Sequence, residues 1–375
     1  MASIALRPQI LAIGPLLPII RADLDLPASV AGLLTTIPVL CMGIFAPLGP
    51  RMAARLGPRV ALALCLAVIV GCGMARSVVP GVPLLMLATL GIGIGIGMAG
   101  AIPSMIVSEH LATRPALGTG AYAGGIVAGS TIAAGIAVPL AVGGDWRMSL
   151  LILSAASSLS IGAWLLLVRG NGVQRRRQRA MRLPWRSSTG WLLVLVFGLQ
   201  SVLYYGVVAW LPNAFVERGW TIAEAGSLIA VFNGVGLATT IGVPLVADRM
   251  GGRRAPLLGA SVVATLALVG IVLTPEFAYA WIVLLGLSLG MVFPLVLTLP
   301  LDVSDDPARV GSVAALMLLG GYILSSLGPV VLGIARDITG DFDTSLWLLV
   351  VVGIGLVACC GALSPARLRH GIRAA

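Results

Sequence analysis

The chain contains no lysine, and only 10% of its 375 residues are charged. A soluble domain carries about a quarter charged residues, so this sequence cannot cover a water-exposed surface with charge. Mean hydropathy is +1.05, and apolar runs of about 20 residues, long enough to cross a hydrocarbon core as helices, fill the chain. The alternating polarity of membrane-barrel strands is absent. The composition predicts an all-α polytopic membrane protein.

Cysteine and histidine are too few, or wrongly placed, for a metal centre. The five cysteines lie inside apolar runs and form no C-x-x-C pair with metal spacing. The two histidines, His110 and His370, lie near segment ends, and H-E-x-x-H is missing. Ser288 in "GLSLG" formally matches the serine-hydrolase elbow, but no histidine lies in any apolar run. We therefore expect no metal, no cofactor and no enzymatic activity.

The apolar runs divide the chain into two sets of six predicted helices. The longest polar stretch, "RGNGVQRRRQRAMRLPWRSS" (169–188), separates the sets. We predict an N-terminal six-helix bundle over 1–168, a basic cytoplasmic linker over 169–189 and a C-terminal six-helix bundle over 190–375. The twelve predicted spans are 2–20, 28–50, 58–77, 82–107, 117–141, 148–168, 190–214, 222–246, 255–275, 278–300, 311–335 and 344–364.

Arginines are distributed unequally between the two sides of this predicted topology. Eighteen fall in the connections and tails of one side, and five fall on the other, namely Arg21, Arg76, Arg147, Arg218 and Arg336. The positive-inside rule then places both termini in the cytoplasm of a multi-pass protein in a bacterial-type inner membrane. The basic linker is a solvated segment beside the lipid bilayer. We expect no nucleic-acid partner.

The two halves also resemble each other. Shifting the first half by 194 residues aligns, without a gap, Leu17-Pro18 with Leu211-Pro212, Pro50 with Pro244, Arg55 with Arg249 and Gly57 with Gly251. A six-helix unit therefore occurs twice, as parallel repeats related by an axis along the membrane normal. Transporters with such halves bind substrate between them, near the bilayer midplane.

Two loops carry a family signature. "PRMAARLGPRV" (50–60) and "PLVADRMGGRR" (244–254) resemble the cytoplasmic loop motif of the major facilitator superfamily, G-x-x-x-D-R-x-G-R-R. The resemblance implies a cytoplasmic gate that contains Arg55, Gly57, Asp248, Arg249 and Gly251. Both copies depart from the motif, with proline where the first glycine is usual. The first copy also has alanine in place of the acid, which puts that half of the gate in doubt.

Longer stretches resemble the branch of this superfamily that contains the cyanate permeases and 2-nitroimidazole transporters. They are "LRPQILAIGPLLPIIRADL" (6–24), "AGLLTTIPVLCMGIFAPL" (31–48), "GLQSVLYYGVVAWLP" (198–212) and "GYILSSLGPVVLGIARDITG" (321–340). The resemblance implies the major facilitator fold. Members of the branch usually begin further upstream. The seventh predicted span, 190–214 (helix 7), also indicates this, because the repeat maps its start to a point five residues before Met1. We therefore expect helix 1 to be shortened at its N-terminus.

Arg7 is a charge inside an apolar run. It aligns with Ser201, eleven residues into helix 7, which is about 16 Å at 1.5 Å per residue and so near the bilayer centre. A signal-peptide charge is disfavoured because Pro8, Pro15 and Pro18 interrupt the run that follows. The alternative that the Arg7 side chain reaches the membrane surface by snorkelling remains open, if the shortened helix is shifted along the membrane normal. A charge at this depth normally faces a polar cavity, so we interpret Arg7 as a substrate-binding residue.

Four further polar residues are predicted at similar depth. Gln200 and Tyr204 lie one turn apart and share a helix face. Asn233 and Tyr322 lie about twelve residues into helices 8 and 11. Hydrogen-bonding groups are costly in hydrocarbon, so each side chain faces either the substrate cavity or another helix. Both alternatives remain open from the sequence.

The predicted function is secondary active transport of a small anion, or of a weak acid carried as its anion. All fourteen acidic residues lie at segment ends or in loops, so we hypothesise that the substrate supplies the negative charge near Arg7. Rocker-switch alternating access by a monomer follows from the family resemblance. The alternatives are a drug or cation exporter of the same superfamily, which predicts a buried acid, and a non-transporting membrane receptor.

Overall fold

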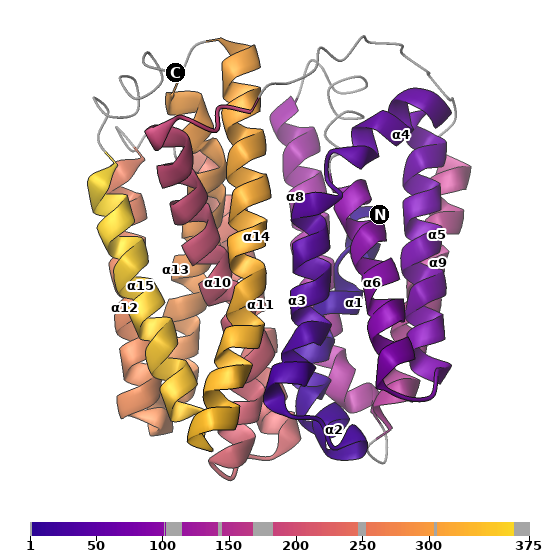
Figure 1. Cartoon of the computed structure of the whole chain (residues 1–375), viewed down its shortest axis with the longest axis vertical. Helices are drawn as coiled ribbons and strands as arrows, with labels where there is room; N and C mark the ends of the chain where they lie inside the picture. Colours follow the sequence, from indigo (N-terminus) through magenta and orange to yellow (C-terminus); the bar gives the residue numbers. More distant parts are fainter. Residues whose placement is uncertain are drawn as a thin grey trace.

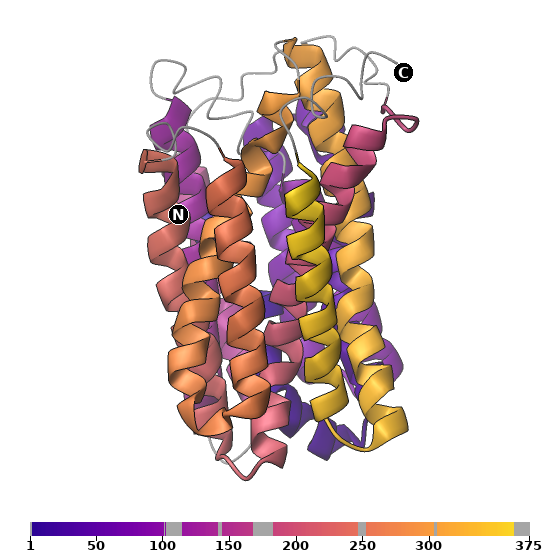
Figure 2. The same cartoon turned by 90° about the vertical axis from the view of Figure 1, so that its left-hand side faces the viewer.

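The computed structural model describes residues 2–100, 102, 115–141, 145–167, 183–246, 253–303 and 306–363. Over these residues the secondary structure is helical, with no strand. The helices run roughly along one common axis, as the two perpendicular views in Figures 1 and 2 show. The all-α prediction is confirmed.

The helices of the first half pack beside those of the second half (Figure 1). The first half contains η1 (Ala2–Ala5), α1 (Pro8–Leu11), α2 (Ile13–Leu24), α3 (Ala28–Ile44), α4 (Leu48–Leu56), α5 (Pro58–Val78), α6 (Val82–Ala99), α8 (Pro115–Leu140) and α9 (Trp146–Leu167). The second half contains α10 (Ser188–Glu217), α11 (Ile222–Val246), α12 (Arg254–Leu273), η4 (Pro275–Phe277), α13 (Ala278–Thr298), η5 (Leu299–Asp302), α14 (Pro307–Thr339) and α15 (Asp343–Ala362).

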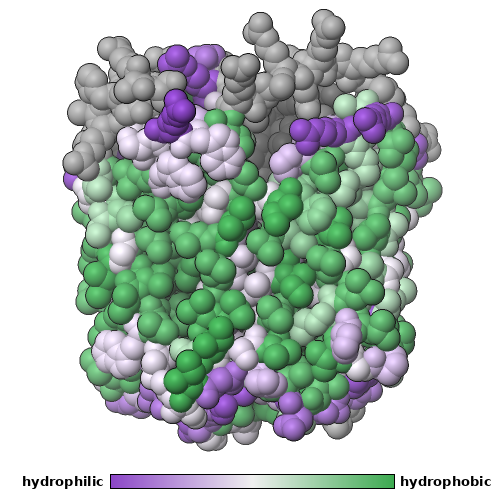
Figure 3. Space-filling view, in the orientation of Figure 1, coloured by the Kyte–Doolittle hydropathy of each residue, from purple (hydrophilic) through white to green (hydrophobic). Residues whose placement is uncertain are grey.

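Every predicted span corresponds to one helix or to a broken set of helices. Within the described ranges, nine single helices are long and apolar enough to cross a membrane, and a tenth span results if α3 and α4 are joined across their 62° bend. The predicted span 28–50 thus covers α3 and the start of α4, and the chain bends between them after Ile44. Figure 3 shows an apolar belt across one face of the molecule with hydrophilic residues towards both ends, as the bilayer requires.

The predicted helix over 2–20 is broken into η1, α1 and α2. Arg7 lies at the break as the N-cap of α1, with φ −113° and ψ −12°. Its neighbour explains the break, because Pro8 has no N–H with which to continue a preceding helix and is well suited to the first position of a new one. Pro15 and Pro18 add two positions without an N–H to donate. Arg7 therefore lies where the helix is interrupted and not inside a continuous helix.

The two halves meet along close helix contacts. A side chain at Gly14 of α2 would collide with the carbonyl of Val208 in α10, and one at Gly32 of α3 would collide with the carbonyl of Pro329 in α14. Small residues allow such close approach in membrane helices. Gly14 and Val208 are 194 residues apart, so the first helices of the two halves contact each other at equivalent positions of the repeat.

Candidate substrate-binding site

A cavity of about 60 Å³ lies between the two halves. One buried water needs about 10–15 Å³ by the same measure, so the cavity has room for a few waters or a small solute. The first half contributes two lining residues, Arg7 and Val127. The second half contributes the others, from α10, α11, α13 and α14: Gln200, Ser201, Tyr204, Tyr205, Phe232, Asn233, Gly236, Thr240, Gly286, Leu289, Gly290, Phe293 and Tyr322.

The structure brings all five predicted substrate-binding residues into this one cavity: Arg7, Gln200, Tyr204, Asn233 and Tyr322. Their sequence positions span more than 300 residues, so the shared cavity is a property of the fold. Ser201, the repeat equivalent of Arg7, lines the same cavity. The role of these residues in binding a substrate remains a prediction.

Arg7 gives the cavity its charge. It is the only charged side chain among the described lining residues. The short helix α1 begins on the backbone of Arg7. The Arg7 carbonyl accepts hydrogen bonds from the amides of Ile10 and Leu11 at 3.0 and 3.1 Å. The side chain is half-buried and close enough to Tyr204 for an electrostatic interaction with its phenol. A fixed positive charge thus lies beside polar, neutral groups.

Neutral hydrogen-bonding groups form part of the same cavity wall. The Tyr204 hydroxyl donates to Asn233 Oδ1 at 2.7 Å, and Asn233 Nδ2 donates to the carbonyl of Ile229 at 2.9 Å. These bonds orient the Asn233 amide and leave the Tyr204 oxygen able to accept a further bond. Gln200 and Ser201 interact more weakly, with 3.3 Å between Ser201 Oγ and Gln200 Oε1.

Aromatic rings complete the cavity wall. Tyr322 packs edge to face on Phe197, with 5.1 Å between ring centroids, and Tyr204 packs on Phe232 at 5.6 Å. Such pairs hold the rings in fixed orientations. The cavity therefore combines one cation, several hydrogen-bonding groups and flat apolar surfaces.

Sequence reasoning missed the glycines of the cavity wall. Gly236 of α11 and Gly286 and Gly290 of α13 line the cavity. A Cβ at Gly290 would meet the backbone of Gly236, and one at Gly286 would meet the carbonyl of Phe232 at 2.6 Å. These two helices therefore pack backbone to backbone. The G-x-x-x-G spacing of 286 and 290 is the signal that predicts this contact.

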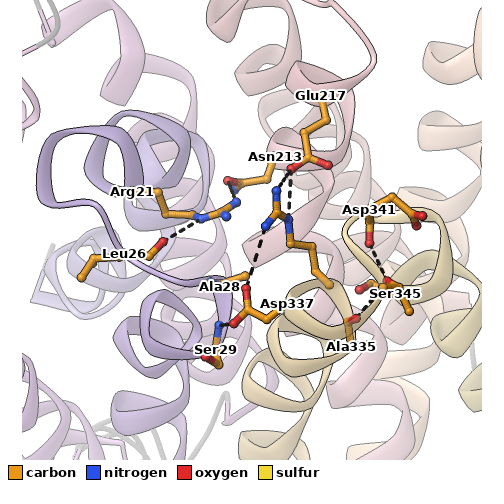
Figure 4. A network of polar contacts seen from close by, with 12 residues as sticks. Arg21, Leu26, Ala28, Ser29, Asn213, Glu217, Ala335, Asp337, Asp341 and Ser345 are labelled. Carbon is orange, nitrogen blue, oxygen red and sulfur yellow. Dashed lines mark hydrogen bonds and ion pairs between the residues drawn. The ribbon is translucent and has the colours of Figure 1, made fainter.

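Polar contacts join the two halves at the lower end of Figure 1, where α2 ends (Figure 4). The Asp337 carboxylate on α14 accepts hydrogen bonds from the backbone amides of Ala28 and Ser29, both at 2.8 Å. Arg21 on α2 donates to Asn213 Oδ1 on α10 at 3.3 Å. We call these contacts the clasp. It closes this end of the interface between the halves.

The predicted gate residues are only partly described. Arg55 is exposed in the last turn of α4, and Gly57 ends that helix with φ +82°, a conformation that favours glycine. Asp248, Arg249 and Gly251 lie outside the described residues. The gate therefore remains a prediction from the family motif.

One arginine lies in a different environment from the one that the sequence suggested. The predicted span 58–77 contains Arg76 close to its end, where an arginine usually faces water, whereas the structure buries its side chain completely in the last turn of α5. The burial follows from a contact with Gln9, 67 residues away, and no local pattern reports such a contact.

Comparison with known proteins supports this description. A family model described as Major Facilitator Superfamily matches residues 7–329. The cyanate transport protein CynX of Escherichia coli is 29% identical, over 94% of this chain and 93% of its own. The 2-nitroimidazole transporter of Escherichia coli is 27% identical, over 97% and 92%. The uncharacterized transporter YycB of Bacillus subtilis is 26% identical, over 92% and 87%.

Solved structures show the same fold. A D-xylose-proton symporter superposes with a TM-score of 0.76 at 16% identity, covering 99% of this chain and 96% of that one. The xylose transporter XylE of Escherichia coli, in an inward open conformation, superposes with a TM-score of 0.77 at 13% identity, covering 96% and 93%. The chain therefore belongs to the major facilitator superfamily, as a multi-pass membrane protein of a family of transporters and not of enzymes.

Proposed function

We propose that this protein is a secondary active transporter that moves a small anion, or a weak acid carried as its anion, by rocker-switch alternating access. One observation carries the proposal: Arg7 supplies the only formal charge among the described lining residues of the cavity. A guanidinium offers a planar fork of donors that suits carboxylate-like and other small planar anions.

The rest of the cavity supports the same class of substrate. The Tyr204 and Asn233 side chains are held by a 2.7 Å hydrogen bond and line the same cavity as Arg7. The aromatic walls offer flat surfaces to a planar solute. Among the relatives, one is named for cyanate, itself a small anion, and one for 2-nitroimidazole, a small planar weak acid.

The arginine distribution supports an orientation. Eighteen of the arginines lie at the span ends, in the connections or in the tails of one predicted side, and we propose that this side is the cytoplasm of a bacterial inner membrane and contains both termini. The clasp then lies on the outer side, and the structure corresponds to a state closed towards the outside. We further propose that the protein is a monomer. Its two bundles, 1–168 and 190–375, are joined by the linker 169–189 and rotate relative to each other about the cavity.

Uptake into proteoliposomes tests the proposal. We define an anion panel of cyanate, nitrate, formate, acetate and 2-nitroimidazole, and compare it with ethidium, a lipophilic cation. The proposal predicts saturable, protein-dependent uptake of at least one panel member and no protein-dependent movement of ethidium. Arg309→Ala, at an exposed arginine of α14 outside the cavity, serves as the control for general loss of positive charge. Ethidium transport without anion uptake would contradict the proposal and favour a cation exporter.

A further inference from the structure

A second buried arginine lies next to the segment that carries Arg7. Arg76 Nη2 donates to the backbone carbonyl of Gln9 at 2.9 Å and to Gln9 Oε1 at 3.0 Å. Gln9 Nε2 in turn donates to Ser154 Oγ at 2.9 Å. We call Gln9, Arg76 and Ser154 the polar clamp. It connects α1 to α5 on one side and to α9 on the other, and all three side chains are buried.

The local sequence makes room for the polar clamp. Gly73 lies one turn before Arg76, and a Cβ there would stand 2.7 Å from Ser154 Oγ and 3.0 Å from Gln9 Oε1. Both distances are shorter than ordinary van der Waals contact. Any larger residue at position 73 would therefore displace the Gln9 amide from between α5 and α9.

Stability alone does not account for the buried charge. Nε and Nη1 of Arg76 have no hydrogen-bond partner among the described residues. Burying a guanidinium is costly, and replacing a buried charge by an apolar side chain of similar volume is often neutral or stabilising. Ionisable residues inside membrane segments are more often tied to function.

The polar clamp supports helix α1, which is too short to be stable on its own. Helix α1 has only four residues, Pro8–Leu11, and its first residue has no N–H. A helix this short has almost no internal hydrogen bonds and is not stable alone. Two bonds from Arg76 and one to Ser154 fix Gln9, which is two residues from Arg7. The position of the Arg7 side chain in the cavity wall therefore depends on the clamp.

We propose that Arg76, acting through Gln9, is a positioning residue that holds α1 and thereby places Arg7 in the substrate cavity. This inference rests on the proposed function of the cavity. It assigns to Arg76 a role in substrate affinity, with no contact to the substrate. A misplacement of about 1 Å can cost as much as 100-fold in rate at a reacting centre. For a binding group held less strictly, we expect about a tenfold rise in both Kd and transport KM when the clamp is opened.

The test compares clamp variants with matched neighbours in purified protein. Arg76→Met and Gln9→Leu should each raise the Kd for the best-binding panel anion about tenfold. The double variant should be little worse than either, because both changes open the same clamp. Melting temperature without anion and kcat should stay near wild type. Ser77→Ala is the control beside Arg76, since the Ser77 hydroxyl donates only within its own helix, to the carbonyl of Gly73.

A milder pair covers the case in which Arg76→Met fails to fold. Ser154→Ala removes one hydroxyl that holds Gln9 and should raise Kd about threefold. Ser157→Ala, on the same helix, removes a hydroxyl that bonds only to the carbonyl of Leu153 and should change nothing. Equal Kd values for both serine variants would overturn the positioning role, as would a fall in melting temperature or kcat of clamp variants with Kd unchanged.

The outcomes separate this inference from the proposed function. Wild-type protein that binds no panel anion would contradict the proposed function itself. Wild-type protein that binds an anion, with binding lost in Arg7→Ala and retained in Arg76→Met and Gln9→Leu, would leave the proposed function standing and overturn the role of Arg76 alone.

Discussion

The first helix of each half descends from the same repeat unit, yet the two copies have different structures. In the second half this helix is α10, one continuous helix of 30 residues, Ser188–Glu217. In the first half it is broken into η1, α1 and α2. At the 194-residue shift, Pro8 and Pro15 align with Val202 and Ala209, whereas Pro18 aligns with Pro212. The copies therefore differ by two prolines, and the break at Arg7 lies directly before the first of them.

The comparison shows how a symmetric fold acquires an asymmetric site. The continuous copy presents Gln200, Ser201 and Tyr204 to the cavity as neutral groups on one regular helix. The broken copy presents the single charge, Arg7, on a segment that hydrogen bonds from α5 and α9 support. The charge that we propose to select the substrate thus comes from one half, and most of the wall comes from the other.

The largest expected effect separates the two repeat-equivalent positions. Arg7→Ala should reduce anion uptake on the order of 100-fold or more, because losing one partner of a desolvated charge pair costs about 2–5 kcal/mol. Ser201→Ala, at the equivalent position of α10, should change uptake less than threefold. Uptake is measured with matched amounts of protein in the membrane. Equal losses in the two variants would show that the copies contribute alike.

A second variant neutralises the net charge of the cavity wall without changing its shape. Asn233→Asp is nearly isosteric and places a carboxylate in the cavity that contains Arg7. It should reduce uptake of panel anions at least tenfold, because an acid in the cavity competes with the substrate for the guanidinium. Asn233→Leu is the control that removes the amide without adding charge, and it should retain more uptake. Concentration-dependent uptake rates distinguish the two, and a reversed order would contradict the electrostatic account.

A third variant makes the two copies alike at their contact point. Gly14→Val introduces a side chain where the Val208 carbonyl lies against α2, and overpacking of this kind typically costs about 1–3 kcal/mol. We expect a lower melting temperature and a weakened interface between the halves. Gly71→Val tests a glycine of α5 with open space around it. Similar melting temperatures for the two variants would show that the contact is not tight.

The smallest expected effect concerns the clasp. Asp337→Asn should lower melting temperature slightly and raise labelling of cysteines introduced near the clasp, because hydrogen bonds to charged groups contribute about 1.5–3 kcal/mol before screening. Asp341→Asn is the control. Asp341 accepts from the amide of Asp343 at 2.9 Å within the second half and does not join the halves. Equal labelling of both variants would show that Asp337 does not hold this end closed.

Much of the site could be predicted because polar groups are rare and costly in apolar helices. Arg7, Gln200 and Asn233 interrupt long apolar runs, and the internal repeat measures their depth without any structure. Since the fold places equal depths of the two halves side by side, these residues meet in one cavity. The prolines that follow Arg7 also indicate an interrupted helix, although the prediction gave one span over 2–20.

Other features depended on contacts that sequence distance hides. Arg76 lies at a segment end, where an arginine usually faces water, and only its partner Gln9 on another helix explains its burial. Asp337 likewise binds backbone amides of Ala28 and Ser29, and such acceptors leave no trace in side-chain patterns. Interactions between helices determine these positions, so local propensity and hydropathy could not predict them.

The central claim is that the Arg7 guanidinium binds an anionic substrate in the cavity, and anion-dependent thermal stabilisation of purified protein tests it most directly. Ligands that bind only the native state raise the melting temperature with concentration. We predict that at least one panel anion stabilises wild-type protein in a saturable manner and leaves Arg7→Ala unchanged. Equal stabilisation of both proteins would contradict the claim.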